Sequence, residues 1–193
     1  MAGRELNYLA TAPDLALGEN HAARRRADLR TICMCWVALG VATVAGVVAG
    51  ATWPALGPPT HPHPTLHPSA SAVALIVVNN LRVLAAPFIL VAARFERHRP
   101  SRLAGDTVVV VILAGNAIAI GLALGRWRET LVPFLPQLPL EYLAAATAAA
   151  AWLDAPHYAR SSGARIAVRY AAATIALTTC AAAIEVLLTP HAR

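Results

Sequence analysis

Residues 72–95 read AVALIVVNNLRVLAAPFILVAARF, and this stretch decides the fold. It is long and apolar enough to be a transmembrane helix, which needs about 20 mainly apolar residues. Near its middle, however, it carries Asn79, Asn80 and Arg82. Lipid cannot hydrogen-bond these groups, and an arginine at the centre of a bilayer costs about 2.5–3.5 kcal/mol on insertion scales. We therefore expect other helices to bring polar partners to this one.

The composition of the whole chain indicates an integral membrane protein. Of its 193 residues, 58% are hydrophobic and only 13% are charged, about half the charged fraction of an average globular domain, which is roughly 25%. Four further apolar runs lie at about 32–52, 107–125, 140–155 and 166–188. Together with 72–95 they predict an all-α fold, a polytopic bundle of five transmembrane helices.

The arginines predict how this bundle lies in the membrane. The net charge is +6 and all 16 basic residues are arginine. A basic balance can indicate nucleic-acid binding, but these arginines adjoin the apolar runs, so we expect no nucleic-acid partner. If the N-terminus is cytoplasmic, Arg82 lies in the membrane and Arg126, Arg128 and Arg193 lie outside, which leaves twelve on the cytoplasmic side. This bias matches the positive-inside rule.

The prediction is thus a multi-pass protein of the bacterial plasma membrane, with residues 1–30 as a cytoplasmic arm and residues 31–190 as one membrane domain. The first span has an alternative interpretation, because residues 49–51 (Ala-Gly-Ala) have the small-x-small form of a signal-peptide cleavage site. A signal-peptide core is typically about 7–15 residues long, so the longer run favours a retained helix. Gly46 and Gly50, with Gly40, would let a second helix approach closely.

The loop at 53–70 is rich in proline and contains His61, His63 and His67. These histidines could bind a metal ion, but neither a cysteine nor a carboxylate is near enough to complete a four-ligand set. We therefore favour an extended linker with incidental histidines. The apolar runs contain no Ser/His arrangement, paired aspartates or HExxH motif, so we expect neither catalysis nor a cofactor.

Two local features are also predicted. Asp106 and Thr107 are well placed to cap the start of the third helix. Residues 126–140 carry Pro133, Pro136 and Pro139 and are predicted to form a second loop.

The polar residues inside the apolar runs are predicted to form one intramembrane cluster of Asn79, Asn80, Arg82, Asn116, Glu141 and Glu185. The topology places both glutamates towards the outer side, so we expect Arg82 to pair with Glu185 or Glu141. A neutral buried pair is far less costly than either ion alone. Such a cluster either specifies helix packing only or forms a substrate, ion or partner site, and the sequence leaves both open.

Three segments occur in a characteristic order: VVNNLRV at 77–83, LPQLPLEYLA at 135–144 and AAAIEVLLTP at 181–190. They resemble, respectively, the paired-asparagine helix, the Pro-His-Gly-x-x-Glu-Leu segment and the closing Ala-Ala-x-Ile-Glu segment of the stage II sporulation protein M family. Gly115-Asn116 with Gly121 resembles the family's Asn-Gly motif in the helix between. The resemblance covers about residues 32–190.

The chain departs from this family pattern at three positions. Gln137 and Leu138 stand where the family usually has His and Gly, and Ala117 follows Asn116 where Gly is usual. The resemblance implies a bacterial membrane protein of five or six helices with no catalytic role of its own. The sporulation member is thought of as a membrane scaffold for cell-wall hydrolases during engulfment, a role that we do not carry over.

We therefore predict a non-catalytic membrane scaffold or assembly subunit. Its partners would be the lipid bilayer and other membrane or envelope proteins, and a homo-oligomer is compatible with the sequence. The alternative is a small transporter or permease subunit that uses the same intramembrane polar residues. That alternative predicts a water-filled cavity that reaches Arg82, Glu141 or Glu185 from one side of the membrane.

Overall fold

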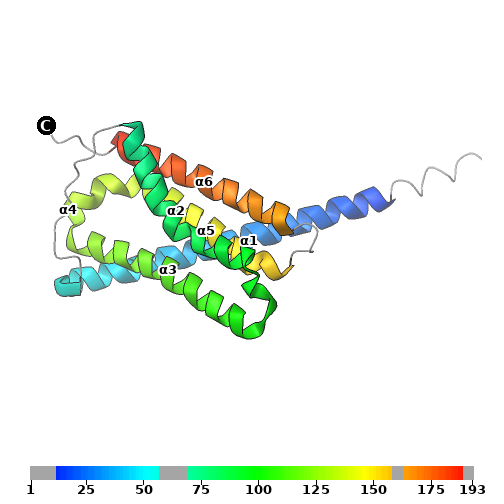
Figure 1. Ribbon diagram of the computed structural model, residues 1–193. Helices are drawn as coiled ribbons and strands as arrows, with labels where there is room; N and C mark the ends of the chain where they lie inside the picture. The colour runs from blue at the N-terminus through cyan, green and yellow to red at the C-terminus, as the bar shows by residue number, and fades with distance from the viewer. Residues whose placement is uncertain (1–11, 57–68, 158–162, 189–193) are drawn as a thin grey trace, which may run out of the picture.

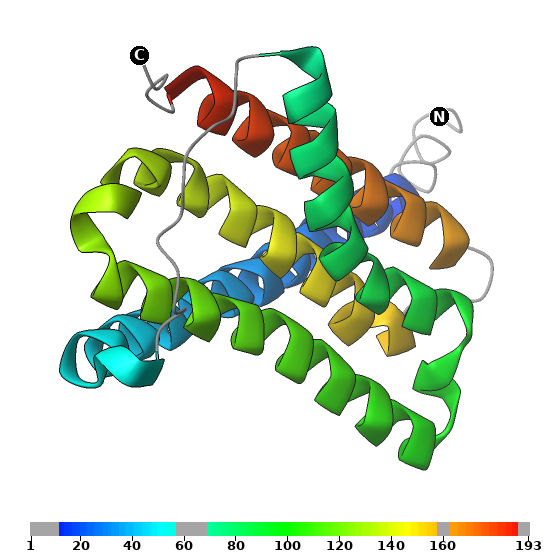
Figure 2. The ribbon, with the colours of Figure 1, turned by 60° about the vertical axis from the view of Figure 1, so that its left-hand side comes forward.

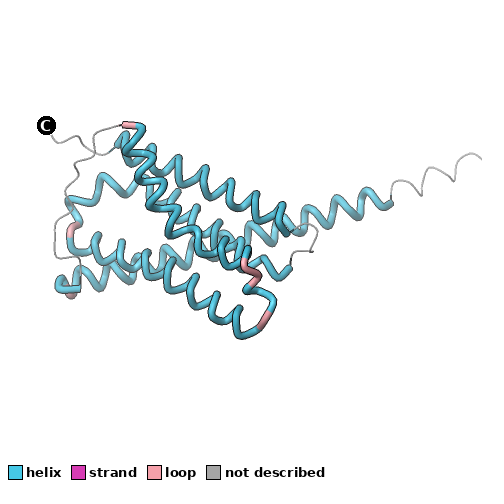
Figure 3. Tube along the Cα trace, in the orientation of Figure 1, coloured by secondary structure: helices cyan, strands magenta, loops and turns pink. Residues whose placement is uncertain are grey.

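The computed structural model describes residues 12–56, 69–157 and 163–188, and within these ranges every regular element is a helix. This confirms the all-α prediction (Figures 1 and 3). The five longer helices are α1 (Ala12–Thr52), α2 (Ala70–Ala92), α3 (Arg99–Arg126), α5 (Leu138–Asp154) and α6 (Gly163–Leu188). The short elements are α4 (Arg128–Leu131) and the 3-10 turns η1 (Pro54–Leu56), η2 (Phe95–Arg97), η3 (Val132–Gln137) and η4 (Ala155–His157).

Among the described residues, four helical segments are long and apolar enough to cross a membrane: residues 26–52 of α1, α2, α3 and residues 164–188 of α6. Many of their large apolar side chains lie on the surface, among them Val111 at 64% and Leu187 at 74% exposure. A soluble monomer rarely exposes contiguous apolar surface on this scale. The chain therefore has the make-up of a multi-pass membrane protein.

The predicted span at 140–155 corresponds to α5, which differs from the other four. It has 17 residues, a length of about 26 Å at 1.5 Å per residue, and it is not among the four long apolar segments. Its middle is buried almost completely, from Ala146 to Trp152. The helices α1, α2 and α6 pack around it, as Figure 2 shows. The small alanine side chains let these neighbours approach α5 closely.

The helices alternate in direction, so their connections gather at two ends of the bundle (Figure 1). At one end the turns η2 and η4 contact each other, and α1 enters the bundle there. Most arginines of the described residues belong to this end, namely Arg26, Arg30, Arg94, Arg97, Arg99, Arg102, Arg165 and Arg169. We call it the arginine-rich end. The other end, which we call the opposite end, carries the connection from α3 to α5, with Arg126 and Arg128.

The most extensive contact between two helices of the bundle joins α1 to α3, and glycines bring the two backbones close together. Gly46 and Gly50 of α1 lie against Gly121 and Gly125 of α3, and we call these four residues the glycine seam. A methyl group built on Gly121 would lie only 2.9 Å from the Cα atom of Gly46. Both helices thus use a small-xxx-small pair for close packing, as membrane helices often do. The thin surface predicted at Gly46 and Gly50 is confirmed, whereas nothing lies within 4 Å of a methyl group built on Gly40.

The helix boundaries correct one local prediction. The helix α3 begins at Arg99, with a proline in its first turn, so the prediction that Asp106 and Thr107 cap its start is wrong. Proline is well tolerated in a first turn because its missing N–H would have no helical partner there. The two predicted caps lie inside α3, where the Oγ1 atom of Thr107 donates to the carbonyl of Leu103 at 2.9 Å.

The segment predicted as the second loop, 126–140, is also more regular than expected. It forms α4 and then η3, which leads directly into α5. Pro133 and Pro139 occupy first-turn positions of η3 and α5. Proline ends a helix when it falls in the interior, but at the first turn its fixed φ favours a new helical start. This segment therefore brings the first residues of α5 to the opposite end of the bundle.

Candidate functional site

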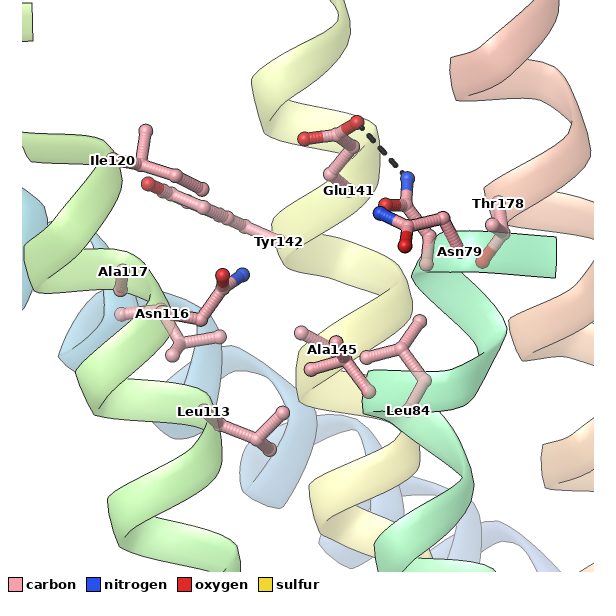
Figure 4. Close-up of a pocket in the computed structure, with 13 residues that line it drawn as sticks. Asn79, Leu84, Leu113, Asn116, Ala117, Ile120, Glu141, Tyr142, Ala145 and Thr178 are labelled. Atoms are coloured by element: carbon pink, nitrogen blue, oxygen red, sulfur yellow. Dashed lines mark hydrogen bonds between the residues drawn. The ribbon is translucent and has the colours of Figure 1, made fainter. Parts of the chain in front are cut away.

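Two adjoining cavities lie between α2, α3, α5 and α6, in the half of the bundle nearer the opposite end. The inner cavity has a volume of about 90 Å³ and the outer one of about 590 Å³. Asn79, Asn80, Ile120 and Glu141 line both of them. We therefore treat the two as one site and call it the polar cavity (Figure 4).

The structure brings five of the six predicted cluster residues to this cavity. Asn79 and Asn80 come from α2, Asn116 from α3, Glu141 from α5 and Glu185 from α6. Asn116 lines the inner part and Glu185 the outer part. The helices α2, α3, α5 and α6 thus each contribute at least one polar side chain to the polar cavity.

A hydrogen bond between α2 and α5 organises the wall of the cavity. The Nδ2 atom of Asn80 donates to the Oε1 atom of Glu141 at 3.3 Å, as the dashed line in Figure 4 shows. Glu141 lies in the first turn of α5, where the positive end of the helix dipole favours a carboxylate. Neighbouring Asn79 is exposed and makes no hydrogen bond to another described residue.

Tyr142 is a further cavity residue, which the sequence interpretation did not single out. Its hydroxyl group forms a hydrogen bond with the Oγ1 atom of Thr43 on α1, and Thr43 donates to the carbonyl of Leu39 at 3.0 Å. In Figure 4 the ring of Tyr142 extends from α5 towards Ile120 and Asn116 on α3. Tyr142 therefore fixes α5 against α1 and forms one wall of the inner cavity. A tyrosine in an apolar run gives little indication of this role in sequence.

Arg82 is the exception, and here the predicted pairing is wrong. Its side chain is exposed, it lines neither cavity, and it forms no ion pair with Glu185 or Glu141. The reason is helix geometry: residues two apart are rotated by about 200° around an α-helix. Asn80 points to Glu141, and Arg82, rotated by about 200° from it, leaves the wall of the cavity and is exposed on the outside of the bundle.

Gln137 is the second residue that the sequence interpretation missed. It lies at the junction of η3 and α5, is only 3% exposed, and lines the outer cavity. Its Oε1 atom has no hydrogen-bond partner among the described residues. Buried polar atoms nearly always have a partner, so an orphaned oxygen calls for an explanation. One signal was present in sequence, since Gln137 stands where the resembled family usually has His.

Close packing fills the bundle towards the arginine-rich end. The indole Nε1 atom of Trp152 donates to the Oδ1 atom of Asp106 at 2.7 Å, and its ring lies against Gly105 of α3. The carboxylate of Asp154 accepts hydrogen bonds from Thr31 at 3.2 Å and from Tyr170 at 3.0 Å. These contacts join α1, α3 and α6 to the end of α5.

Metal binding finds no support among the described residues, where no group of three or more His, Cys, Asp or Glu could hold an ion. The three histidines of the proline-rich loop, His61, His63 and His67, lie outside the described residues.

Comparison of the chain with models of protein families, with curated proteins and with solved structures finds no match. The site is therefore interpreted from its own geometry and from the sequence.

Proposed function

We propose that the chain is a multi-pass protein of the bacterial plasma membrane, with five passes and a cytoplasmic N-terminus. Two observations support this. The helices alternate in direction, and the described arginines concentrate at one end, as the positive-inside rule requires of a cytoplasmic end. The helix α5 would make the fourth pass, since about 26 Å approaches the hydrocarbon thickness of about 30 Å and its neighbours shield it from lipid.

The orientation can be tested by labelling single cysteines in intact cells with a membrane-impermeant maleimide, after the native cysteines have been replaced. We expect Arg128→Cys at the opposite end to be labelled and Arg97→Cys at the arginine-rich end to be protected. The reverse pattern would contradict the proposed orientation.

Within the membrane, the chain acts as a non-catalytic assembly subunit, and Arg82 is the observation that carries this proposal. Arg82 lies close to the midpoint of α2, about 15 Å from either boundary of the hydrocarbon core. It is exposed on the outside of the bundle, on the same face as Val78 and Ile89, which are 49% and 63% exposed. An arginine near a helix end can reach the headgroups, but one at the midpoint favours a carboxylate partner in the membrane.

This partner is best supplied by a different membrane protein. In the described residues, the carboxylates of Glu141 and Glu185 line the polar cavity. Asp106 and Asp154 accept hydrogen bonds towards the arginine-rich end. The helix α2 itself contains neither Asp nor Glu, so a symmetric pairing of the α2 faces of two copies would bring two arginines together. We therefore propose a heteromeric complex in which a partner helix carries an Asp or Glu opposite Arg82.

The resemblance to the stage II sporulation protein M family, whose sporulation member is regarded as a scaffold, is consistent with an assembly role. The three segments of this chain that resemble the family also meet at one site, which adds support. Asn80 from 77–83 donates to Glu141 from 135–144, and Glu185 from 181–190 lines the same cavity. Segments that share a motif pattern in sequence thus share one site in space.

The assembly role is tested by extracting the tagged chain from its native membrane in a mild detergent. We expect the wild type to migrate in native electrophoresis as a complex with a second membrane protein, and Arg82→Leu to migrate alone with an unchanged yield. Arg169→Leu is the matched control, because Arg169 is also exposed but belongs to the arginine-rich end. Replacement of the partner's intramembrane carboxylate should have the same effect as Arg82→Leu.

Two outcomes would contradict the assembly proposal. The first is a wild-type chain that is monomeric in its native membrane, as judged by cross-linking before extraction. The second is a complex that survives Arg82→Leu intact. A complex that contains only this chain would contradict the heteromeric form of the proposal.

A second candidate function, a small transporter or permease subunit, is favoured by the outer cavity. That alternative predicts solvent access to Glu141 or Glu185, and an open cavity of about 590 Å³ lies against both. Proteoliposomes that contain the chain would accumulate a labelled cavity ligand faster than empty liposomes if the chain transports it. Equal rates would remove this candidate for that ligand.

A further inference from the structure

The connection between α2 and α3 carries a dense positive charge. Residues 94–102 read RFERHRPSR, with four arginines and a single carboxylate. They form the turn η2 and the first turn of α3, at the margin of the bundle in Figure 2. The side chains of Arg94, Arg97 and Arg99 are exposed, and that of Arg102 is half-buried. We call these four residues the arginine patch.

The described part of the chain supplies no partner for the arginine patch. None of its four guanidinium groups forms an ion pair or a hydrogen bond with another described residue. Glu96 belongs to the same turn, but its Oε2 atom is buried without a partner. The nearby carboxylate of Asp106 accepts a hydrogen bond from Trp152. Each guanidinium group has five N–H donors, so the patch offers both charge and donors to a ligand outside the chain.

The backbone of Arg94 gives a separate indication that its side chain is needed. Its φ of 60° lies in the left-handed region, and it is the only non-glycine residue of the described ranges with a positive φ. Its N–H group donates to the carbonyl of Val91 at 3.0 Å, at the end of α2. Glycine is the usual residue in this conformation, because a Cβ atom is disfavoured there. An exposed arginine at such a position fits a role in binding a molecule outside the chain.

Apolar side chains adjoin the patch on both helices. Ile89 in the last turn of α2 is 63% exposed, and Leu103, which follows the patch in α3, is 69% exposed. Both helices are long and apolar enough to cross a membrane, so in a bilayer their connection lies at the level of the lipid headgroups. A phospholipid there would place its phosphate against the guanidinium groups and its acyl chains against the apolar side chains. Arginine can hold a phosphate group through two N–H groups at once.

From these observations we infer that the arginine patch binds an anionic phospholipid of the surrounding bilayer. Clusters of about 4–8 basic residues next to a transmembrane helix are typical of anionic-lipid binding. A zwitterionic lipid also carries an ammonium group, which the patch repels, so the patch selects for a lipid with a net negative charge. The inference goes beyond the assembly role and does not rest on it, since Arg82 is not part of the patch.

The test is native mass spectrometry of the full chain in detergent, titrated with dioleoylphosphatidylglycerol or with dioleoylphosphatidylcholine. The two lipids share their acyl chains and their phosphate but differ in net charge. We expect the wild type to bind the phosphatidylglycerol at least tenfold more tightly, and we expect salt to weaken this preference by screening. Arg97→Gln combined with Arg99→Gln should remove most of the preference.

Arg128→Gln is the matched control, because Arg128 is also exposed but belongs to the opposite end, and it should keep the full preference. Arg94→Gly separates binding from structure. It introduces the residue that is favoured in the left-handed region. We therefore expect several-fold weaker binding of phosphatidylglycerol with no decrease in the unfolding temperature. If the double variant does not fold, Arg94→Gly and the comparison of the two lipids on the wild type decide the matter.

Three results with the lipids would overturn the inference: equal affinity of the wild type for both lipids, an unchanged preference in the folded patch variants, or an equal loss of preference in Arg128→Gln. Displacement of the phosphatidylglycerol by single-stranded RNA or by millimolar glycerol 3-phosphate would also overturn it, because the patch would then be a nucleic-acid or soluble-phosphate site. None of these results bears on the proposed assembly role, which is read from the Arg82 complex. The failure of one proposal is therefore distinguishable from the failure of the other.

Discussion

The two faces of α3 meet their neighbours in opposite ways. On one face, Gly121 and Gly125 bring the backbone of α3 against that of α1 at the glycine seam. On the other face, Asn116 and Ile120 lie across the polar cavity from α2 and α5 (Figure 4). A single helix thus forms the most extensive helix contact of the bundle and one wall of its site.

The difference teaches what holds membrane helices together. Lipid tails are as apolar as leucine, so helices gain little from burying apolar side chains against each other in a bilayer. Contact at the seam comes from small residues that allow dense van der Waals packing. Where α3 carries a larger polar side chain instead, as at Asn116, the neighbouring helices stay apart and hydrogen bonds such as Asn80–Glu141 join them.

The largest loss of stability is expected from a bulky side chain in the glycine seam, which would keep α1 and α3 apart. Gly121→Leu would place a side chain into the backbone of α1, because even a methyl group there would lie 2.9 Å from the Cα atom of Gly46. Overpacking typically costs about 1–3 kcal/mol and sometimes more, so we expect a loss of about 3 kcal/mol in thermal or denaturant unfolding in detergent. Gly115→Leu on the same helix is the matched control, since nothing lies within 4 Å of its position. Equal losses would show that the seam has no special role.

A second prediction extends the comparison to the packed region near the arginine-rich end, where α3 is again in close contact through Gly105. Trp152→Phe removes the N–H group that donates to Asp106 at 2.7 Å but keeps an aromatic side chain at this position. A hydrogen bond to a charged group contributes about 1.5–3 kcal/mol, so we expect a loss of about 2 kcal/mol. A double-mutant cycle with Asp106→Leu measures the coupling. A coupling energy near zero would contradict the assignment.

The third prediction concerns the cavity side. Asn80→Leu removes the amide that joins α2 to Glu141, and hydrogen bonds between membrane helices are worth on average about 0.6 kcal/mol and at most about 1.7. We expect a loss of about 1 kcal/mol in unfolding free energy. Asn79→Leu is the matched control, because Asn79 lies next to Asn80 but its own side-chain amide makes no hydrogen bond to another described residue. A larger loss for Asn79→Leu would mean that the organising contact has been misassigned.

The smallest effect is expected at Arg82. Its side chain is exposed, and substitutions at exposed positions usually change stability by less than about 0.5 kcal/mol. Arg82→Gln should therefore leave the unfolding of the isolated chain nearly unchanged in detergent, while it weakens the proposed complex. A loss comparable with that of Asn80→Leu would indicate that Arg82 belongs to the internal cluster after all.

Much of the architecture could be predicted because it depends on local composition. The apolar runs predict the helices, and the run at 140–155 forms the helix α5. The site was harder to predict. The one signal for Gln137 in the sequence was its place where the resembled family usually has His, and its importance comes from the burial that η3 and α5 impose. The start of α3 was missed because His98 and Arg99 look like part of a polar loop in sequence.

The sequence by itself determined an all-helical chain with several apolar segments, and it limited the polar residues inside those segments to a few amides and charged groups. Only the tertiary structure decided which of them meet. Asn80 and Arg82 are two residues apart, yet one donates to Glu141 and the other faces outward. The helical period fixes the angle of about 200° between them. The rotation of α2 about its own axis is set by its packing against α5 and α6, which no local pattern encodes.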